Sequence, residues 1–202
     1  MNTDINRIVY GTVPSDEIIL DTNEITARLQ ARGDILSQGV VRDCLNELMD
    51  AIQCKYAYVR VPASYPEEFK TDLGFGAIQS KALYLNLGSA KEAFIFAVTI
   101  GIGVDRLLMK LSLISQTRHF VTDALASAAA EAACDKADTL IKGALKCKTR
   151  FSPGYADLPI EIQTNILATL NAQKLLGITL NKAFLMTPVK SITAIMGICN
   201  EE

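Results

Sequence analysis

The segment RFSPGYADLPIEIQ, from Arg150 to Gln163, contains residue types that are suited to holding a small molecule. The guanidinium of Arg150 is a planar fork that pairs with a carboxylate through two parallel hydrogen bonds. Gly154 lets the backbone approach a ligand closely, and Tyr155 offers an aromatic face with a polar tip. The sequence therefore predicts a structured loop at the entry to a helix. This loop either binds a ligand or is a rigid turn in which Arg150 caps the preceding helix.

A row of acidic residues lies on the alanine-rich segment 119–146, which predicts a long helix. Asp123, Glu131 and Asp135 are spaced eight and four residues apart, so they lie along one stripe of that helix. Acidic residues on helices are mostly exposed, and in one interpretation the stripe is a solvated face. In the other, Glu131 faces a ligand that carries a positive charge.

The sequence GIG at 101–103 joins a predicted strand to a predicted helix, where dinucleotide-binding proteins place their phosphate-binding glycines. Their fingerprint requires a third glycine three residues after the second, and Arg106 occupies that position. Two alternatives follow, a partial phosphate site or a turn whose glycines let the helix pack tightly on the strand.

No set of catalytic side chains emerges from the sequence. The chain has one histidine, His119, and lacks a nucleophile elbow, a phosphate-binding loop and a zinc-protease motif. Its five cysteines form no CxxC pair, which predicts reduced thiols and no zinc site. The formal charge of −2, with scattered basic residues, argues against nucleic acid as a partner. We therefore expect a binding or accessory module.

Hydropathy and length give the expected location and size of the protein. The longest apolar run, AFIFAVTIGIGV, has twelve residues and is too short to span a membrane. The first twenty residues lack the basic start and apolar core of a signal peptide. We expect a cytoplasmic protein without membrane contact. The 202 residues, half of them apolar, fit a single domain over 1–202.

The pattern of apolar residues predicts an α+β fold with a mostly antiparallel sheet flanked by helices. Apolar residues spaced three and four positions apart in 24–35 and 39–53 predict two amphipathic helices, so 1–55 is expected to be a helical N-terminal region. Alternation in KYAYVRV, 55–61, predicts the first strand of the sheet.

Later segments complete this expected sheet and its covering helices. AFIFAVTI, 93–100, predicts a buried central strand, and KSITAIMGI, 190–198, predicts the closing strand. Asp157 is expected to cap a helix that continues to Gly177.

The chain also resembles a known domain. Arg150-x-x-x-Gly154-Tyr155 is similar to the RxxxGY signature of the C-terminal activation domain of cobalamin-dependent methionine synthase. The resemblance covers about 73–198, because further segments follow in the order seen in free-standing relatives of that domain. They are SKALYLNL, FIFAVTIGIGVDRL, DALASAAAEAACD, LGITL and LMTPVKSITAIMG. One departure is Ala144, which stands where the family has an acidic residue, six positions before the arginine.

The resemblance implies a binding site for S-adenosylmethionine. In the family, the arginine pairs with the carboxylate of the methionine moiety, and backbone groups around the Pro-Gly-Tyr turn contact the adenosine. The site residues implied here are Arg150, Ser152, Pro153, Gly154 and Tyr155. Glu131 joins this set only by its position on the predicted helix.

The resemblance also implies a function, that of a free-standing reactivation subunit. In the family, oxidised cobalamin is reduced and then methylated by S-adenosylmethionine. The expected partner is therefore a methionine synthase core or another corrinoid protein that carries the cobalamin, with a flavodoxin-type electron donor acting on the complex. This chain would supply orientation to the methyltransferase rather than catalytic side chains. The alternatives are an adaptor for corrinoid proteins that has lost S-adenosylmethionine binding, and a small-molecule sensor.

Overall fold

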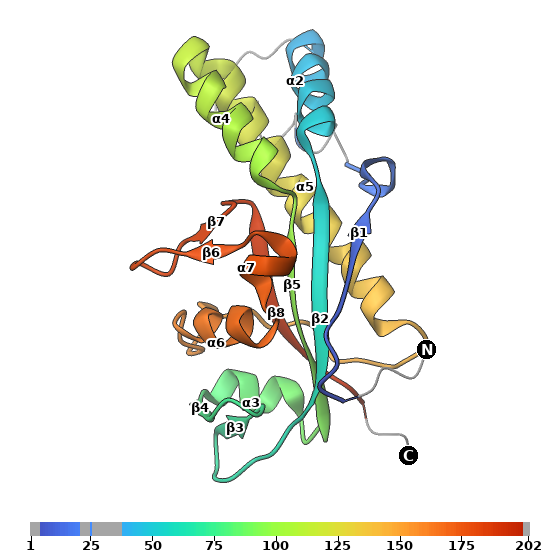
Figure 1. Cartoon of the computed structure of the whole chain (residues 1–202), viewed down its shortest axis with the longest axis vertical. Helices are drawn as coiled ribbons and strands as arrows, with labels where there is room; N and C mark the ends of the chain where they lie inside the picture. Colours follow the sequence, from blue (N-terminus) through green and yellow to red (C-terminus); the bar gives the residue numbers. More distant parts are fainter. Residues whose placement is uncertain (1–4, 21–24, 26–37, 200–202) are drawn as a thin grey trace.

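The main sheet has four strands in the order β1-β2-β5-β8, and each neighbouring pair is antiparallel (Figure 1). The computed structural model describes residues 5–20, 25 and 38–199, so almost all of the helix expected over 24–35 lies outside the described residues. The strands are β1 (Val9–Val13), β2 (Cys54–Pro62), β5 (Glu92–Thr99) and β8 (Ser191–Gly197). The predicted α+β fold with an antiparallel sheet is confirmed.

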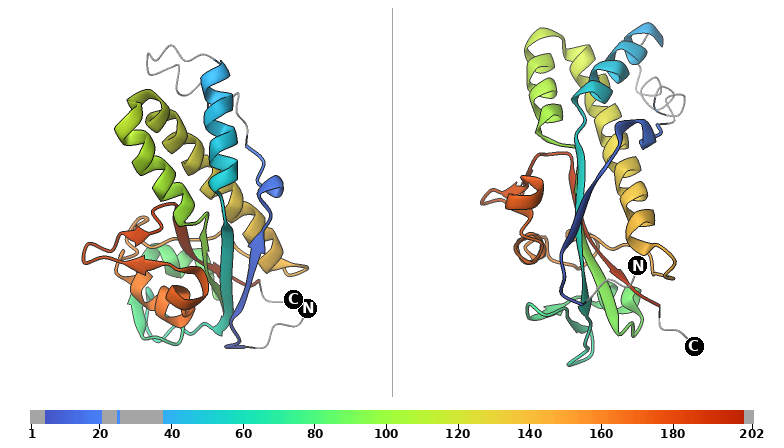
Figure 2. Two further views of the ribbon diagram at one scale, coloured as in Figure 1. Left: turned by 45° about the horizontal axis from the view of Figure 1, so that its top comes forward. Right: turned by 45° about the vertical axis from the view of Figure 1, so that its right-hand side comes forward.

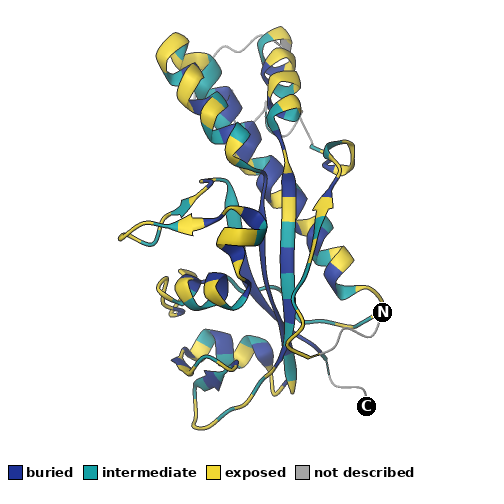
Figure 3. Ribbon diagram, viewed as in Figure 1, coloured by how far each residue is buried: buried dark blue, intermediate teal, exposed yellow. Residues whose placement is uncertain are grey.

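Strand β5 supplies both hydrophobic cores because its successive side chains point to opposite faces of the sheet. Phe94, Phe96 and Val98 belong to one core. Ala93, Ile95 and Ala97 belong to the other. All six are at most 2 % exposed, and Figure 3 shows burial concentrated on this strand and on the helix faces that meet the sheet. The prediction of a buried central strand is confirmed.

The helices form two groups, one on each side of the sheet, and the first group extends beyond the ends of the strands (Figures 1 and 2). The first core lies beneath α2 (Gln38–Ala51), α4 (Ile102–Ile114) and α5 (Gln116–Lys142). The second lies beneath α3 (Lys81–Leu87), α6 (Ile162–Thr169) and α7 (Ala172–Leu176). None of the helices in the described part of the chain is long and apolar enough to cross a membrane.

Helix α5 packs closely on the sheet through alanine side chains. The residues that make this face are small and buried: Ala126, Ala129, Ala130, Ala133 and Ala137. Because they bring the helix axis near the sheet, carboxylates on the neighbouring stripe of α5 come within reach of the segments at the sheet edge.

The strand predicted at 55–61 is present as β2, but β1 precedes it, so the prediction that the sheet begins at 55–61 is wrong. The region 1–55 contains α2 as expected, but also the edge strand β1 and a short 3-10 helix, η1 (Ser15–Glu17). Gly11 lies in the middle of β1, where it interrupts the usual strand signal. It is paired with Tyr56, and a Cβ at Gly11 would lie 2.8 Å from the Tyr56 hydroxyl, so the glycine makes room for that ring.

The helix expected to run to Gly177 is also divided. Helix α6 ends at Thr169 and α7 starts at Ala172, because Asn171 between them adopts a positive φ of 49°. Two small hairpins complete the fold. They are β3 (Lys70–Asp72) with β4 (Ala77–Gln79), and β6 (Thr179–Leu180) with β7 (Met186–Thr187).

Candidate functional site

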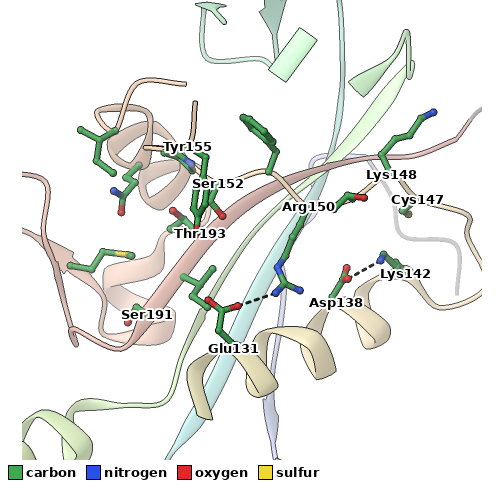
Figure 4. A pocket seen from close by; sticks show the side chains of 17 residues that line it. Glu131, Asp138, Lys142, Cys147, Lys148, Arg150, Ser152, Tyr155, Ser191 and Thr193 are labelled. Atoms are coloured by element: carbon green, nitrogen blue, oxygen red, sulfur yellow. Dashed lines mark hydrogen bonds and ion pairs between the residues drawn. The ribbon is translucent and has the colours of Figure 1, made fainter. Parts of the chain in front are cut away.

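A cavity of about 710 Å³ lies at the β8 edge of the main sheet. Its walls come from α5, the connection between α5 and α6, the first turn of α6, β7 and the start of β8. In Figure 4, Arg150 projects into the middle of this space, with Tyr155 and Thr193 at one end and Lys142 and Lys148 at the other. The fold therefore gathers segments that are distant in sequence around one arginine.

The connection that carries Arg150 is held against β8 by backbone hydrogen bonds. The Lys148 amide donates to the Gly197 carbonyl at 2.8 Å, and Phe151 and Ile195 exchange two bonds at 2.8 and 2.9 Å. Isolated bridges pair Cys147 with Ile198 and Phe151 with Ile195. Residues 148–150 lie between the bridges on the connection, and residues 196–197 lie between them on the opposite segment, so the connection has one extra residue. Such a bulge re-aims side chains at a sheet edge, and Arg150 lies within it.

The next four residues, Ser152 to Tyr155, form a tight turn. The Tyr155 amide donates to the Ser152 carbonyl at 3.2 Å, with Pro153 at the second position and Gly154 at the third. Gly154 has a φ of 88°, which the third position of a type II turn requires and which glycine adopts without strain. The Gly154 amide also donates to the Leu158 carbonyl at 2.9 Å, so the turn is closed on itself.

Asp157 anchors this loop to a different helix from the one predicted. Its carboxylate accepts hydrogen bonds from the Ser80 hydroxyl at 2.6 Å and from the amides of Lys81 and Ala82 at 2.8 and 3.1 Å. These groups lie at the start of α3, so the prediction that Asp157 caps the following helix is wrong. The hydrogen bond from Ser80, with those from the two amides, holds the pKa of Asp157 below its ordinary value.

Arg150 is paired with the acidic stripe of α5. Its guanidinium donates to Asp135 at 2.5 Å and to Glu131 at 3.0 Å, and its side chain is 24 % exposed. Burial opposes the arginine's charge, but the hydrogen bond to Asp135 and the charges of both carboxylates raise its pKa above the ordinary value. Arg150 therefore contacts helix side chains rather than the helix end. Asp123, on the same stripe, pairs with Lys190 at 2.8 Å.

Five of the six predicted site residues line the cavity: Glu131, Arg150, Ser152, Pro153 and Tyr155. The sixth, Gly154, lies inside the turn, where a Cβ would be 3.0 Å from Ile160 Cδ1. The structure thus brings the six residues together, while their roles toward a ligand stay predictions.

Two further residues of the cavity were not predicted. Asp138 pairs with Lys142 at 2.7 Å through one oxygen (Figure 4), and its other oxygen is buried without a hydrogen-bond partner among the described residues. Gln163 is 4 % exposed, and its Oε1 also has no such partner within the described chain. No sequence motif marks either residue, because an orphaned atom is a property of tertiary packing.

The cysteines near the cavity are poor nucleophiles. Burial raises the pKa of Cys147, which lines the cavity, to about 11. Burial likewise raises the pKa of Cys134 on α5 to about 12. Since the thiolate is the reactive form, both remain protonated near neutral pH. The arrangement is suited to holding and orienting a ligand rather than to attacking it.

Comparisons with known proteins agree with this fold. No protein family and no curated protein matches the sequence. Among solved structures, the chain is similar to a crystal structure of the MetH reactivation domain bound to AdoHcy, with a TM-score of 0.70 and 16 % identity. The match covers 96 % of this chain and 79 % of that one. This chain therefore has the fold of the MetH reactivation domain.

Proposed function

We propose that the protein binds S-adenosylmethionine in the cavity around Arg150 and acts as a free-standing reactivation subunit for a corrinoid protein. The sequence resemblance and the shared fold with a domain that binds AdoHcy support this proposal. The volume of about 710 Å³ lies within the range of small-molecule sites, roughly 300–1,000 Å³.

The observation that carries the proposal is the position of Arg150. A loop anchored to β8 and α3 holds its guanidinium inside the cavity, next to the carboxylates of Glu131 and Asp135. A guanidinium beside two carboxylates suits a zwitterionic ligand, because the ligand carboxylate can pair with the arginine while the acidic groups attract its positive charges. S-adenosylmethionine carries such charges at its sulfonium and amino groups.

The chain's own contribution is orientation. Arg150 fixes the amino acid end of the donor, the turn at 152–155 supplies backbone groups at close approach, and Tyr155 offers an aromatic surface. The cobalamin of the partner supplies the nucleophile for methyl transfer, and a flavodoxin-type protein is the candidate electron donor. Because the nucleophile comes from the partner, this chain needs none of its own. A cavity in which the raised pKa of Cys147 keeps its thiol protonated is consistent with that role.

Calorimetry with S-adenosylmethionine tests the proposal directly. Arg150→Ala is expected to weaken binding by about 1.5–3 kcal/mol, the range for a charge-assisted hydrogen bond, and Arg150→Lys should restore it only in part. Arg106→Ala, which removes an exposed arginine from α4, is the matched control and should bind normally. Absence of binding by the unmutated protein, with and without a corrinoid partner, would contradict the proposal.

A turnover assay separates the reactivation subunit from the adaptor. A methionine synthase core without its activation domain should lose activity as oxidised cobalamin accumulates. Adding this protein with S-adenosylmethionine and a reductant should restore that activity, saturating with the protein's concentration. Complex formation without rescue would favour the adaptor instead.

A further inference from the structure

Gln163 is a buried polar residue whose side-chain oxygen is left unsatisfied at the cavity wall. It is 4 % exposed, it lines the cavity, and its Oε1 is buried with no hydrogen-bond partner among the described residues. An unpaired buried amide destabilises the folded state, so native proteins keep very few of them. A ligand group that completes the hydrogen bonding would give this residue a reason to be buried.

The position of Gln163 shows which part of a ligand it would meet. It lies in the first turn of α6, and its backbone amide donates to the Ile160 carbonyl at 3.1 Å, so the start of the helix holds Gln163 next to Ile160. Ile160 packs against Gly154 beside Tyr155. Gln163 is therefore tied through Ile160 to the turn that carries Tyr155, and Figure 4 shows Tyr155 at the opposite end of the cavity from Asp138 and Lys142.

This end of the cavity has walls that suit a flat heteroaromatic ring. Tyr155 contributes an aromatic side chain, and Ile160, which lies beside Gly154, contributes apolar surface. Met186 and Ile192 add further apolar lining to the cavity. Lys142 and Lys148 line the other end (Figure 4). Arg150, between the two, is placed to hold a carboxylate, so a nucleoside joined to an amino acid would lie with its base near Gln163.

We propose that Gln163 is the residue that recognises the adenine base of the ligand. Its amide oxygen accepts a hydrogen bond from the 6-amino group, and its amide nitrogen donates to a neighbouring ring nitrogen. A carboxamide is complementary to adenine in this two-bond manner. The inference rests on the proposed function, because it takes S-adenosylmethionine and its thioether product as the ligands.

Two probes measure base recognition by calorimetry. They are S-adenosylhomocysteine and its analogue with unsubstituted purine, which lacks only the 6-amino group. The unmutated protein should bind the adenine form about tenfold more tightly, the effect of one buried hydrogen bond. Gln163→Leu should reduce this preference to within about twofold. Gln173→Leu, which removes an exposed glutamine from α7, should retain it.

Thermal unfolding of the free protein distinguishes a ligand-binding role from a structural one. Gln163→Leu is expected to raise the melting temperature, because it replaces an unsatisfied buried amide with an apolar side chain of similar size. Gln163→Met, which is unbranched like glutamine, gives a second variant for the same two measurements. A lowered melting temperature with an unchanged base preference would overturn the inference.

The failures of the two proposals have different signatures. If the unmutated protein binds both probes equally, recognition by Gln163 is wrong while the proposed function stands. If it binds neither probe nor S-adenosylmethionine, the proposed function fails as well.

Discussion

Two glycine turns of this protein look alike in sequence and differ in what surrounds them. At 101–103, a Cβ at Gly103 would lie 2.5 Å from the Ala51 carbonyl oxygen. A Cβ at Gly101, whose φ is 94°, would lie 3.0 Å from the Gln53 carbonyl oxygen. Backbone from the end of α2 and from the link between α2 and β2 fills this space. At 152–155, a Cβ at Gly154 would meet only the flexible end of the Ile160 side chain, and the neighbours of Gly154 line the cavity.

The comparison shows that a glycine at a turn indicates close approach without saying of what. At 101–103 the approaching group is the protein's own backbone, which favours the tight-packing alternative over a phosphate site. At 152–155 the space beside the turn is open. Mutations at and around the two turns separate these situations.

Gly103→Ala is expected to destabilise the protein by about 3 kcal/mol, at the upper end of overpacking effects, because a backbone carbonyl cannot change rotamer to relieve the contact. Chemical denaturation measures this loss. Gly154→Ala is the matched variant. Its left-handed backbone conformation should cost about 1–2 kcal/mol, and ligand affinity should fall as well. Equal destabilisation by the two variants would remove the distinction between the turns.

Asp157→Ala should lower the melting temperature at neutral pH, because the amides at the start of α3 lose their acceptor. The folded-state pKa of Asp157 is lowered from 3.8, so its stabilisation is present above that value and is lost as the pH falls through the folded pKa. The difference between variant and unmutated protein should therefore shrink in acid.

Asp43→Ala, at an exposed position of α2, is the control for this pH series and should leave the melting curve nearly unchanged. The Gly103→Ala deficit should not follow the same acid profile, since steric overlap carries no charge. A deficit for Asp157→Ala that persists unchanged in acid would show that the anchor does not depend on the carboxylate charge.

Glu131→Gln is expected to have the smallest effect, because the Glu131 side chain is 63 % exposed and water screens its charge. The substitution should weaken the binding of S-adenosylmethionine about fivefold more than the binding of S-adenosylhomocysteine, since only the former has a positively charged sulfur. Asp123→Asn, on the same helix and paired with Lys190, should affect both ligands equally. Equal losses of affinity for the two ligands in Glu131→Gln would indicate that Glu131 belongs to a solvated helix face and does not contact the ligand.

The elements that could be predicted from the sequence are those whose signals are local. Alternation predicts the strands near 55–61 and 190–198, the β-branched and aromatic content predicts the strand at 93–100, and the alanine-rich pattern predicts α5, because each signal lies within one element. The six predicted site residues could be named for a similar reason. Five belong to one short motif, and Glu131 was chosen for its charge on a predicted helix.

Which distant groups meet could not be predicted, because it depends on how the elements pack against one another. Arg150 reaches across 19 residues to Glu131, and Asp157 reaches across 76 to the Lys81 amide instead of capping its own helix. Gln163 is left without a partner because of what packs around it, and no period or motif records that. Such pairings depend on how the chain crosses the sheet, so the physical reason is topology rather than local propensity.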